Sequence, residues 1–325
     1  MQLARYSLIF VCLLASLAFN QASADSSTPK AVFIIIDGVP ADVIEKTATP
    51  AIDEIASIGG YARAYVGGEA GGESESPTSS AIGYQSLITG TWSNKHNVYD
   101  NDVENPNYDY WDIFRIAKHH DPSLSTALFS TWEDNRTKLI GDGLAQAGGF
   151  KLDHYVDGFE KDTERFPHDP ISNYIRDIDE LVASEATDYI ESKGPDLSWV
   201  YLQYTDDVGH GVGDGALQTS AVQLMDERVG MIWNAVKARS ESTDEDWLII
   251  VTTDHGRDAD TGRGHGGQTI RERTTWISTN SKRLNEHFLG VPGIVDILPS
   301  IAVHMGLTMP DHIRDQLDGK SFIDQ

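Results

Sequence analysis

The 325-residue chain has a single cysteine, few basic residues and no apolar run long enough to span a bilayer. Cys12 lies near the start of the chain, so disulfides, zinc–thiolate sites and a cysteine nucleophile are excluded for the remainder. With 25 Lys and Arg against 50 Asp and Glu, the formal net charge is −25. This charge repels nucleic acid phosphates and anionic lipid headgroups, which makes both poor partners for the protein.

Residues 1–24 have the pattern of a signal peptide. Arg5 precedes an apolar stretch at 8–14, and Ala22-Ser23-Ala24 supplies the small-x-small motif that signal peptidase cleaves. We therefore predict cleavage after Ala24 and export to the periplasm or the extracellular space. No stable membrane anchor is expected, because the apolar stretch is shorter than the ~20 residues of a spanning helix. Residues 25–325 are expected to form one catalytic α/β domain.

Apolar, β-branched runs alternate with helical patterns along this domain. The strongest runs predict buried strands at 31–36, 199–204 and 247–252, and weaker patterns predict strands at 61–66, 124–130 and 274–279. Helical periodicity predicts helices at 51–58, 80–87, 110–119, 171–192 and 218–238. The alternation is typical of a mostly parallel sheet with helices on both faces. The segment 134–170 fits it poorly and is interpreted as a small, loop-rich cap insertion.

Carboxylate and imidazole groups follow each of the three strongest strands. The carboxyl ends of parallel strands meet at one edge of a sheet, so we expect these groups to lie close together there. A single Asp at such a position is more often a helix cap or turn residue, but three such groups at one edge favour a functional site. The residues are Asp37, Asp206, His210, Asp254, His255 and His265.

Six oxygen and nitrogen ligands without a thiolate suit divalent metal ions, zinc above all, with manganese or iron as alternatives. Two ions with three ligands each can clamp the attacking and leaving oxygens of a phosphoryl transfer. A nucleophile is expected nearby. Thr78-Ser79-Ser80 precedes an apolar helix, and a helix N-terminus favours an anionic alkoxide and a phosphate. A plain N-cap is the alternative interpretation of each hydroxyl.

Four motifs, in their order along the chain, resemble the alkaline phosphatase superfamily and, within it, the type I phosphodiesterase/nucleotide pyrophosphatase family. They are Ile36-Asp37-Gly38-Val39, the stretch 77–90, Asp206-x-x-Gly209-His210, and Asp254-His255-Gly256 with His265. The resemblance implies an alkaline-phosphatase-like fold with two divalent ions. It also implies a hydrolase whose substrate is a small phosphate ester or a nucleotide.

The resemblance further implies a role for each residue. The nucleophile of the family lies ten residues before the Gly of a Thr-Gly pair, and counting back from Gly90 gives Ser80 rather than Thr78 or Ser79. The implied mechanism has two displacements: a metal-activated Ser80 attacks phosphorus, and water then hydrolyses a phosphoseryl-type intermediate. One metal would be held by Asp37, Asp254, His255 and Ser80, and the other by Asp206, His210 and His265.

One position departs from the family pattern. Family members usually carry Asn three residues after the nucleophile, where it helps to hold a phosphate oxygen, and this chain has Gly83 there. Either another donor replaces it, with Asn97 and Asn101 as candidates, or the substrate is bound differently.

Three functions remain open. The first is a secreted phosphodiesterase or nucleotide pyrophosphatase, and the second is a phosphomonoesterase at the same site. Monoesterases tend to carry extra cationic phosphate donors, for which Arg136, Arg257 and Arg263 are candidates. The third is an inactive metal-binding protein, which would be expected to have lost a ligand or the nucleophile, and none is missing. A sulfatase is disfavoured, because no cysteine remains to become formylglycine and no Cys/Ser-x-Pro-x-Arg motif is present.

Overall fold

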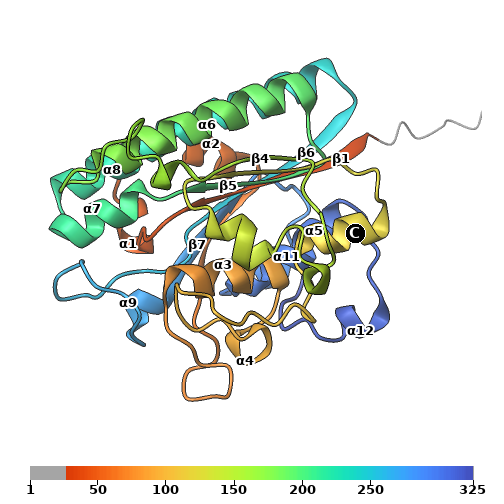
Figure 1. The fold of residues 1–325 in the computed structure, drawn as a ribbon, viewed down its shortest axis with the longest axis horizontal. Helices are drawn as coiled ribbons and strands as arrows, with labels where there is room; N and C mark the ends of the chain where they lie inside the picture. The colour runs from red at the N-terminus through yellow and green to blue at the C-terminus, as the bar shows by residue number, and fades with distance from the viewer. Residues whose placement is uncertain (1–26, 325) are drawn as a thin grey trace, which may run out of the picture.

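A computed structural model describes residues 27–324, and the expected signal peptide lies outside these residues. The chain folds around a seven-stranded sheet with the order β2-β7-β6-β1-β5-β3-β4 (Figure 1). The strands are β1 (Thr28–Ile36), β2 (Gly60–Tyr65), β3 (Thr126–Ser130), β4 (His154–Val156), β5 (Leu197–Leu202), β6 (Glu245–Thr252) and β7 (Thr274–Thr279). The pairs among β6, β1, β5, β3 and β4 are parallel, whereas β7 and β2 are antiparallel to their neighbours. The predicted α/β fold with a mostly parallel sheet is therefore confirmed.

Helices cover both faces of the sheet, as predicted. In Figure 1, α6 and α8 lie along one face and α3, α5 and α11 lie against the other. The helices are α1 (Ala41–Ile44), α2 (Pro50–Ile58), α3 (Ser80–Thr89), α4 (Ser93–His96), α5 (Ile113–His120), α6 (Asn173–Lys193), α7 (Tyr204–Val212), α8 (Ala216–Ser242), α9 (Ile270–Arg273), α10 (Glu286–Leu289), α11 (Ile297–His304) and α12 (Asp311–Arg314). None of the helices in the described part of the chain is long and apolar enough to cross a bilayer.

The central strand β1 shows why the apolar runs are continuous rather than alternating. Val32, Ile34 and Ile36 pack into the core beneath α2, α6 and α8, whereas Phe33 and Ile35 pack into the core beneath α3 and α11. A strand covered by helices on both faces has no solvent side, so every position favours an apolar residue.

The segment 134–170 lies beside β3. It contains a π-helix η1 (Asn135–Ile140), two short 3₁₀ helices, η2 (Ala145–Ala147) and η3 (Phe159–Lys161), and the edge strand β4. Because β4 pairs in parallel with β3, part of this segment extends the sheet itself.

The sheet brings three chain segments together at one edge. β1 lies between β6 and β5, and Ile36 is level with Leu202 while Ile35 is level with Thr252. The loops that follow these strands therefore leave the sheet side by side. In Figure 1 they emerge at the left, where α7 and α9 flank the edge.

Candidate metal centre and nucleophile

Residues from two strand ends and one helix start surround the Nε2 atom of His255. This nitrogen lies 3.4 Å from Oδ1 of Asp37, 3.4 Å from Oδ2 of Asp254 and 3.5 Å from Oγ of Ser80. All four side chains are buried. Ligands bound at about 2.0–2.1 Å to a tetrahedral zinc ion stand about 3.4 Å apart, and the three distances from His255 Nε2 match this separation.

Two carboxylate oxygens in this group are buried and have no hydrogen-bond partner within the described chain. They are Oδ1 of Asp37 and Oδ2 of Asp254, the same atoms that lie nearest to His255. Their partner oxygens are occupied: the Gly38 N–H donates to Asp254 at 3.0 Å, and the hydroxyls of Tyr84 and Tyr201 both donate to Asp37. An unpaired buried carboxylate oxygen is costly, and a divalent cation would satisfy both. The residues therefore fit a metal ion.

The pKa shifts in this group also favour a bound cation. Burial, followed by the charges of Asp254 and Asp206, raises the pKa of Asp37, and burial is also the main cause of the raised pKa of Asp254. Burial lowers the pKa of His255, so its imidazole is neutral and can act as a ligand. A cation among these groups would favour the ionised carboxylates and offset the cost of burying them.

The backbone sets the orientation of two imidazoles. Nδ1 of His255 lies 2.8 Å from the carbonyl oxygen of Gly256, and Nδ1 of His265 lies 3.2 Å from that of Thr78. Because a carbonyl only accepts, each Nδ1 carries the proton and each Nε2 presents its lone pair to the cluster. The two rings stack with centroids 3.9 Å apart.

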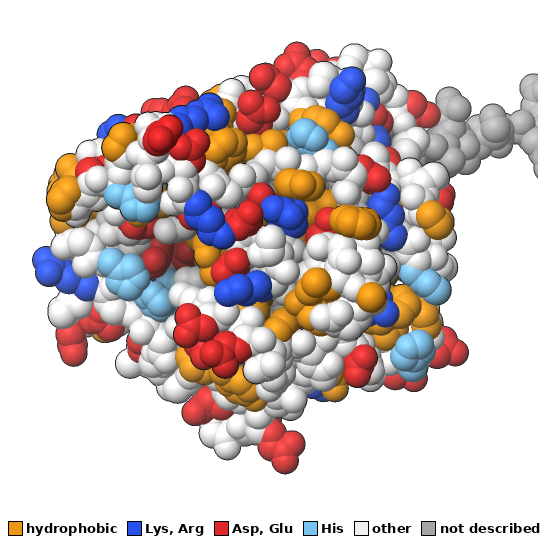
Figure 2. Space-filling view, viewed as in Figure 1, with side chains coloured by type: hydrophobic (Ala, Val, Ile, Leu, Met, Phe, Trp, Pro, Cys, Tyr) orange, Lys and Arg blue, Asp and Glu red, His pale blue; other side chains and the backbone are white. Residues whose placement is uncertain are grey.

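A second group lies directly beside the first. Asp206 and His210 are one turn apart on α7 and share a face, with Oδ2 of Asp206 3.2 Å from Nε2 of His210. Nε2 of His265 lies 3.1 Å from Nε2 of His210 and 3.9 Å from Oδ1 of Asp206. Oδ1 of Asp206 is also 3.9 Å from His255, which links the groups. The structure thus brings all six predicted ligands and Ser80 into one cluster, and histidine side chains reach the surface between α7 and α9 (Figure 2).

The three hydroxyls at the start of α3 have different environments. Thr78 is fully buried, and its Oγ1 donates to the Gly267 carbonyl at 2.8 Å and accepts from the Gly266 N–H at 3.1 Å. It therefore holds the loop that carries His265. Ser80 is the first residue of α3, and its Oγ alone among the three lies against His255. The helix N-terminus at Ser80 favours negative charge on this oxygen.

Gly83 is a close-packing position. A Cβ atom there would lie 2.7 Å from the Asp254 carbonyl oxygen and 2.8 Å from the Asp254 Cβ, so Asn could not replace it without moving α3 away from a predicted ligand. Asn101 lies next to the nucleophile instead, where its Oδ1 accepts from the Ala81 N–H at 3.0 Å. The side-chain amide of Asn97 donates to the Asn105 carbonyl.

A model of the family described as Type I phosphodiesterase / nucleotide pyrophosphatase matches residues 31–299. The chain belongs to this family. Its members are phosphoric ester hydrolases, and the match spans every residue of the cluster, from Asp37 to His265. A comparison with curated proteins gave no match.

Solved structures share the fold of this family member at low sequence identity. Murine ectonucleotide pyrophosphatase/phosphodiesterase 5 is 14% identical with a TM-score of 0.60, over 87% of this chain and 96% of that chain. A 2-O GAG sulfatase is 15% identical with a TM-score of 0.65, over 90% and 73%. A phosphonate monoester hydrolase of Agrobacterium radiobacter is 14% identical with a TM-score of 0.57, over 90% and 76%. The fold is thus alkaline-phosphatase-like.

The three arginines considered for phosphate binding are not equivalent in this family member. Arg257 is fully buried, and its guanidinium donates to three backbone carbonyls and to the Asp206 carboxylate. Arg136 forms a salt bridge with Asp157 at 2.6 Å. Arg263 is exposed, and no carboxylate among residues 27–324 pairs with it. Of these three, Arg263 is the one whose guanidinium pairs with no carboxylate in the described part of the chain.

Sequence reasoning missed the residues that hold the ligands in place. Tyr84 falls in a helix and Tyr201 in an apolar strand, where tyrosine ordinarily signals packing. Nothing in either pattern shows that both hydroxyls converge on one carboxylate. The contact between Arg257 and Asp206 also could not be predicted from the sequence, because the two residues are far apart along the chain and meet only at the sheet edge.

Proposed function

We propose that the protein is a two-metal phosphodiesterase or nucleotide pyrophosphatase with Ser80 as its nucleophile. The observation that carries this proposal is the close approach of three oxygens to His255: Ser80 Oγ and two carboxylate oxygens without a partner in the described chain lie 3.4–3.5 Å from one imidazole nitrogen. Two divalent ions, zinc first, would be bound. One would be held by Asp37, Asp254, His255 and Ser80, and the other by Asp206, His210 and His265.

Bound at these ligands, the ions would lower the pKa of the Ser80 hydroxyl and neutralise charge that builds up on the phosphoryl oxygens. Ser80 Oγ gives up its proton to solvent and forms a bond to phosphorus as the bond to the leaving oxygen breaks. The leaving oxygen takes the bonding electron pair, and a serine-linked phosphoryl intermediate remains. Water then attacks phosphorus, and Ser80 leaves with the proton restored to its oxygen. The Oδ1 of Asn101 accepts from the Ala81 N–H next to Ser80, and we assign to the amide N–H₂ of Asn101 the phosphoryl-oxygen contact that Gly83 cannot make.

The arginines favour a diester over a monoester. A phosphomonoester carries one more negative charge than a diester near neutral pH and calls for more cationic donors. The guanidinium of Arg257 is already engaged within the protein, and Arg136 is paired with Asp157. The exposed Arg263 is the one observation that favours the phosphomonoesterase alternative. The proposed signal peptide would place either activity outside the cytoplasm.

A direct comparison of rates tests the substrate class. Zinc-loaded protein 25–325 is assayed on nitrophenyl phosphate and on a nucleotide nitrophenyl diester, and we expect the larger kcat/KM for the diester. Arg263→Ala provides the control, because it should change diester turnover little. Faster cleavage of the monoester, with a selective loss of that activity in Arg263→Ala, would establish the phosphatase instead.

A further inference from the structure

The two ligand groups differ in how their carboxylates are paired. In the first group, Asp37 and Asp254 each keep one buried oxygen without any partner in the described chain. In the second group, both oxygens of Asp206 have nitrogen partners. Oδ1 accepts from Nη2 of Arg257, and Oδ2 lies 3.2 Å from Nε2 of His210.

The guanidinium beside Asp206 is fixed by the backbone and does not depend on that carboxylate for its position. Arg257 is fully buried, with its Nε 2.9 Å from the Gly38 carbonyl and its Nη1 2.9 Å from the Arg263 carbonyl. A side chain at Gly209 would overlap the guanidinium, so α7 also leaves room for it. A permanent positive charge is therefore part of the second group.

We propose that Arg257 makes the cation site at Asp206, His210 and His265 the weaker of the two. This inference rests on the proposed two-metal function. A divalent ion in the first group meets two carboxylates, whereas an ion in the second meets one carboxylate that it shares with a guanidinium. The shared carboxylate attracts the ion less, and the guanidinium repels it through a buried, weakly screened environment.

Unequal affinities give the second ion a regulatory role. The first site stays filled at metal concentrations that leave the second partly occupied, so turnover follows the free metal concentration around the protein. Arg257 acts here as a positioning and tuning residue: its guanidinium donates to the Asp206 carboxylate, a ligand of the ion, and otherwise to backbone carbonyls.

Competition with a chromophoric chelator measures zinc binding without any assay of turnover. The full protein 25–325 should bind zinc in two steps whose dissociation constants differ by about a hundredfold or more. Asp206→Asn should remove the weaker step, and Asp254→Asn should remove the tighter one. Two equal steps, or loss of the tighter step in Asp206→Asn, would overturn the inference. Absence of both steps would refute the metal-dependent function itself.

Replacement of the arginine tests its role directly. Arg257→Met should tighten the second step by about tenfold or more and leave the first within about threefold. The matched control is Arg271→Met, because Arg271 also ties loops beside the cluster but pairs with Asp42 and Asp214. It should leave both steps within about threefold. A weakened second step in folded Arg257→Met would show that the arginine supports binding, contrary to the inference. If this variant does not fold, the two carboxylate variants still decide the order of affinities.

Discussion

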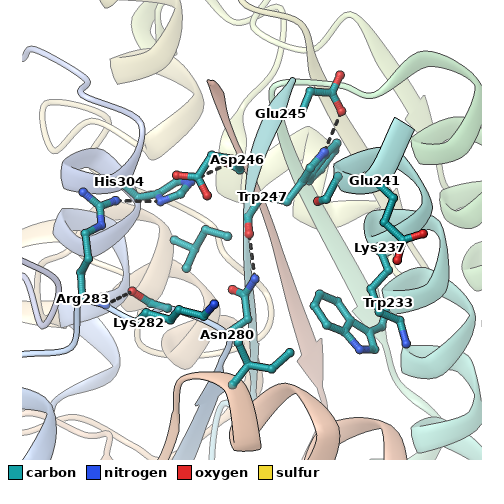
Figure 3. Close-up of a pocket in the computed structure, with 14 residues that line it drawn as sticks. Trp233, Lys237, Glu241, Glu245, Asp246, Trp247, Asn280, Lys282, Arg283 and His304 are labelled. Atoms are coloured by element: carbon teal, nitrogen blue, oxygen red, sulfur yellow. Dashed lines mark hydrogen bonds between the residues drawn. The ribbon is translucent and has the colours of Figure 1, made fainter. Parts of the chain in front are cut away.

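The two ends of the sheet differ in how their buried ionisable groups are paired. At the amino end, a cavity of about 500 Å³ lies between α8, β6 and the chain after β7 (Figure 3). There His304 contacts Arg283 at 3.1 Å and two backbone carbonyls, while Glu245 is paired with Arg239 and Trp247. At the carboxyl end, one buried oxygen each of Asp37 and Asp254 lacks a hydrogen-bond partner among the described residues. Two unpaired carboxylate oxygens that lie close to one imidazole, rather than cavity volume, thus mark the carboxyl end as the candidate site.

Removal of divalent ions should have the largest effect on turnover, and it should act only through the cluster at the carboxyl end of the sheet. Chelation is expected to lower diester turnover by at least about a thousandfold, and added zinc should restore it, because among residues 27–324 the only side chain hydrogen-bonded to Ser80 Oγ is the proposed ligand His255. Turnover before and after chelation, followed by metal analysis, measures this. Full activity of chelated, metal-free protein would contradict the proposal that the carboxyl end of the sheet holds a metal site.

Ser80→Ala should lower kcat by at least about a thousandfold while zinc content stays unchanged, because Asp37, Asp254 and His255 still hold the ion. The control is Ser79→Ala. Because the Ser79 hydroxyl makes no capping hydrogen bond, this variant should stay within about threefold of the parent rate. A parent-like rate in Ser80→Ala would move the nucleophile elsewhere.

Gly83→Ala should destabilise the protein by about 1–3 kcal/mol, because the new methyl group overlaps the backbone of Asp254. Denaturant unfolding gives the free energy. Gly211→Ala is the matched control in α7, where an added Cβ meets nothing within 4 Å, and it should be neutral or slightly stabilising. Equal stability of the two variants would show that α3 does not pack against the ligand loop as described.

Tyr201→Phe should weaken zinc binding by about tenfold, because its hydroxyl, 2.6 Å from Asp37 Oδ2, keeps the other oxygen of Asp37 directed to the site. Chelator competition measures the affinity. Tyr189→Phe removes a hydroxyl far from the cluster, on a ring that stacks on His154, and should leave the affinity unchanged. The same loss in both variants would attribute the effect to general loosening of the fold.

The smallest effect on catalysis is expected at the amino end. Arg283→Met breaks the contact with His304 and should cost about 0.5–1.5 kcal/mol of stability without changing kcat/KM. Thermal unfolding and diester turnover together check this. A large loss of turnover at unchanged stability would show that the amino end of the sheet also takes part in catalysis, contrary to the contrast drawn between the two ends.

The sequence was sufficient to predict the parts of the molecule that depend on local residue patterns. The runs that became β1, β5 and β6 are mostly apolar on both sides of the strand because both faces of the sheet are covered, and each leads into residues of the cluster. The six proposed ligands could be named for that reason. The partners of these ligands could not, because the contacts of Tyr84, Tyr201 and Arg257 depend on side chains from distant segments meeting at the sheet edge. The pairing of the short strand β4 with β3 had no signal either, since three residues carry too little periodicity.

The most direct test of the account is to trap the intermediate on Ser80. Zinc-loaded protein is mixed with a nucleotide diester, quenched during turnover and digested, and the peptide that contains Ser80 is analysed by mass spectrometry. The account predicts that this peptide gains the mass of a nucleotidyl group, attached at Ser80, and that Ser79→Ala gives the same adduct. Sustained turnover with Ser80 unmodified, or an adduct on another residue, would contradict it.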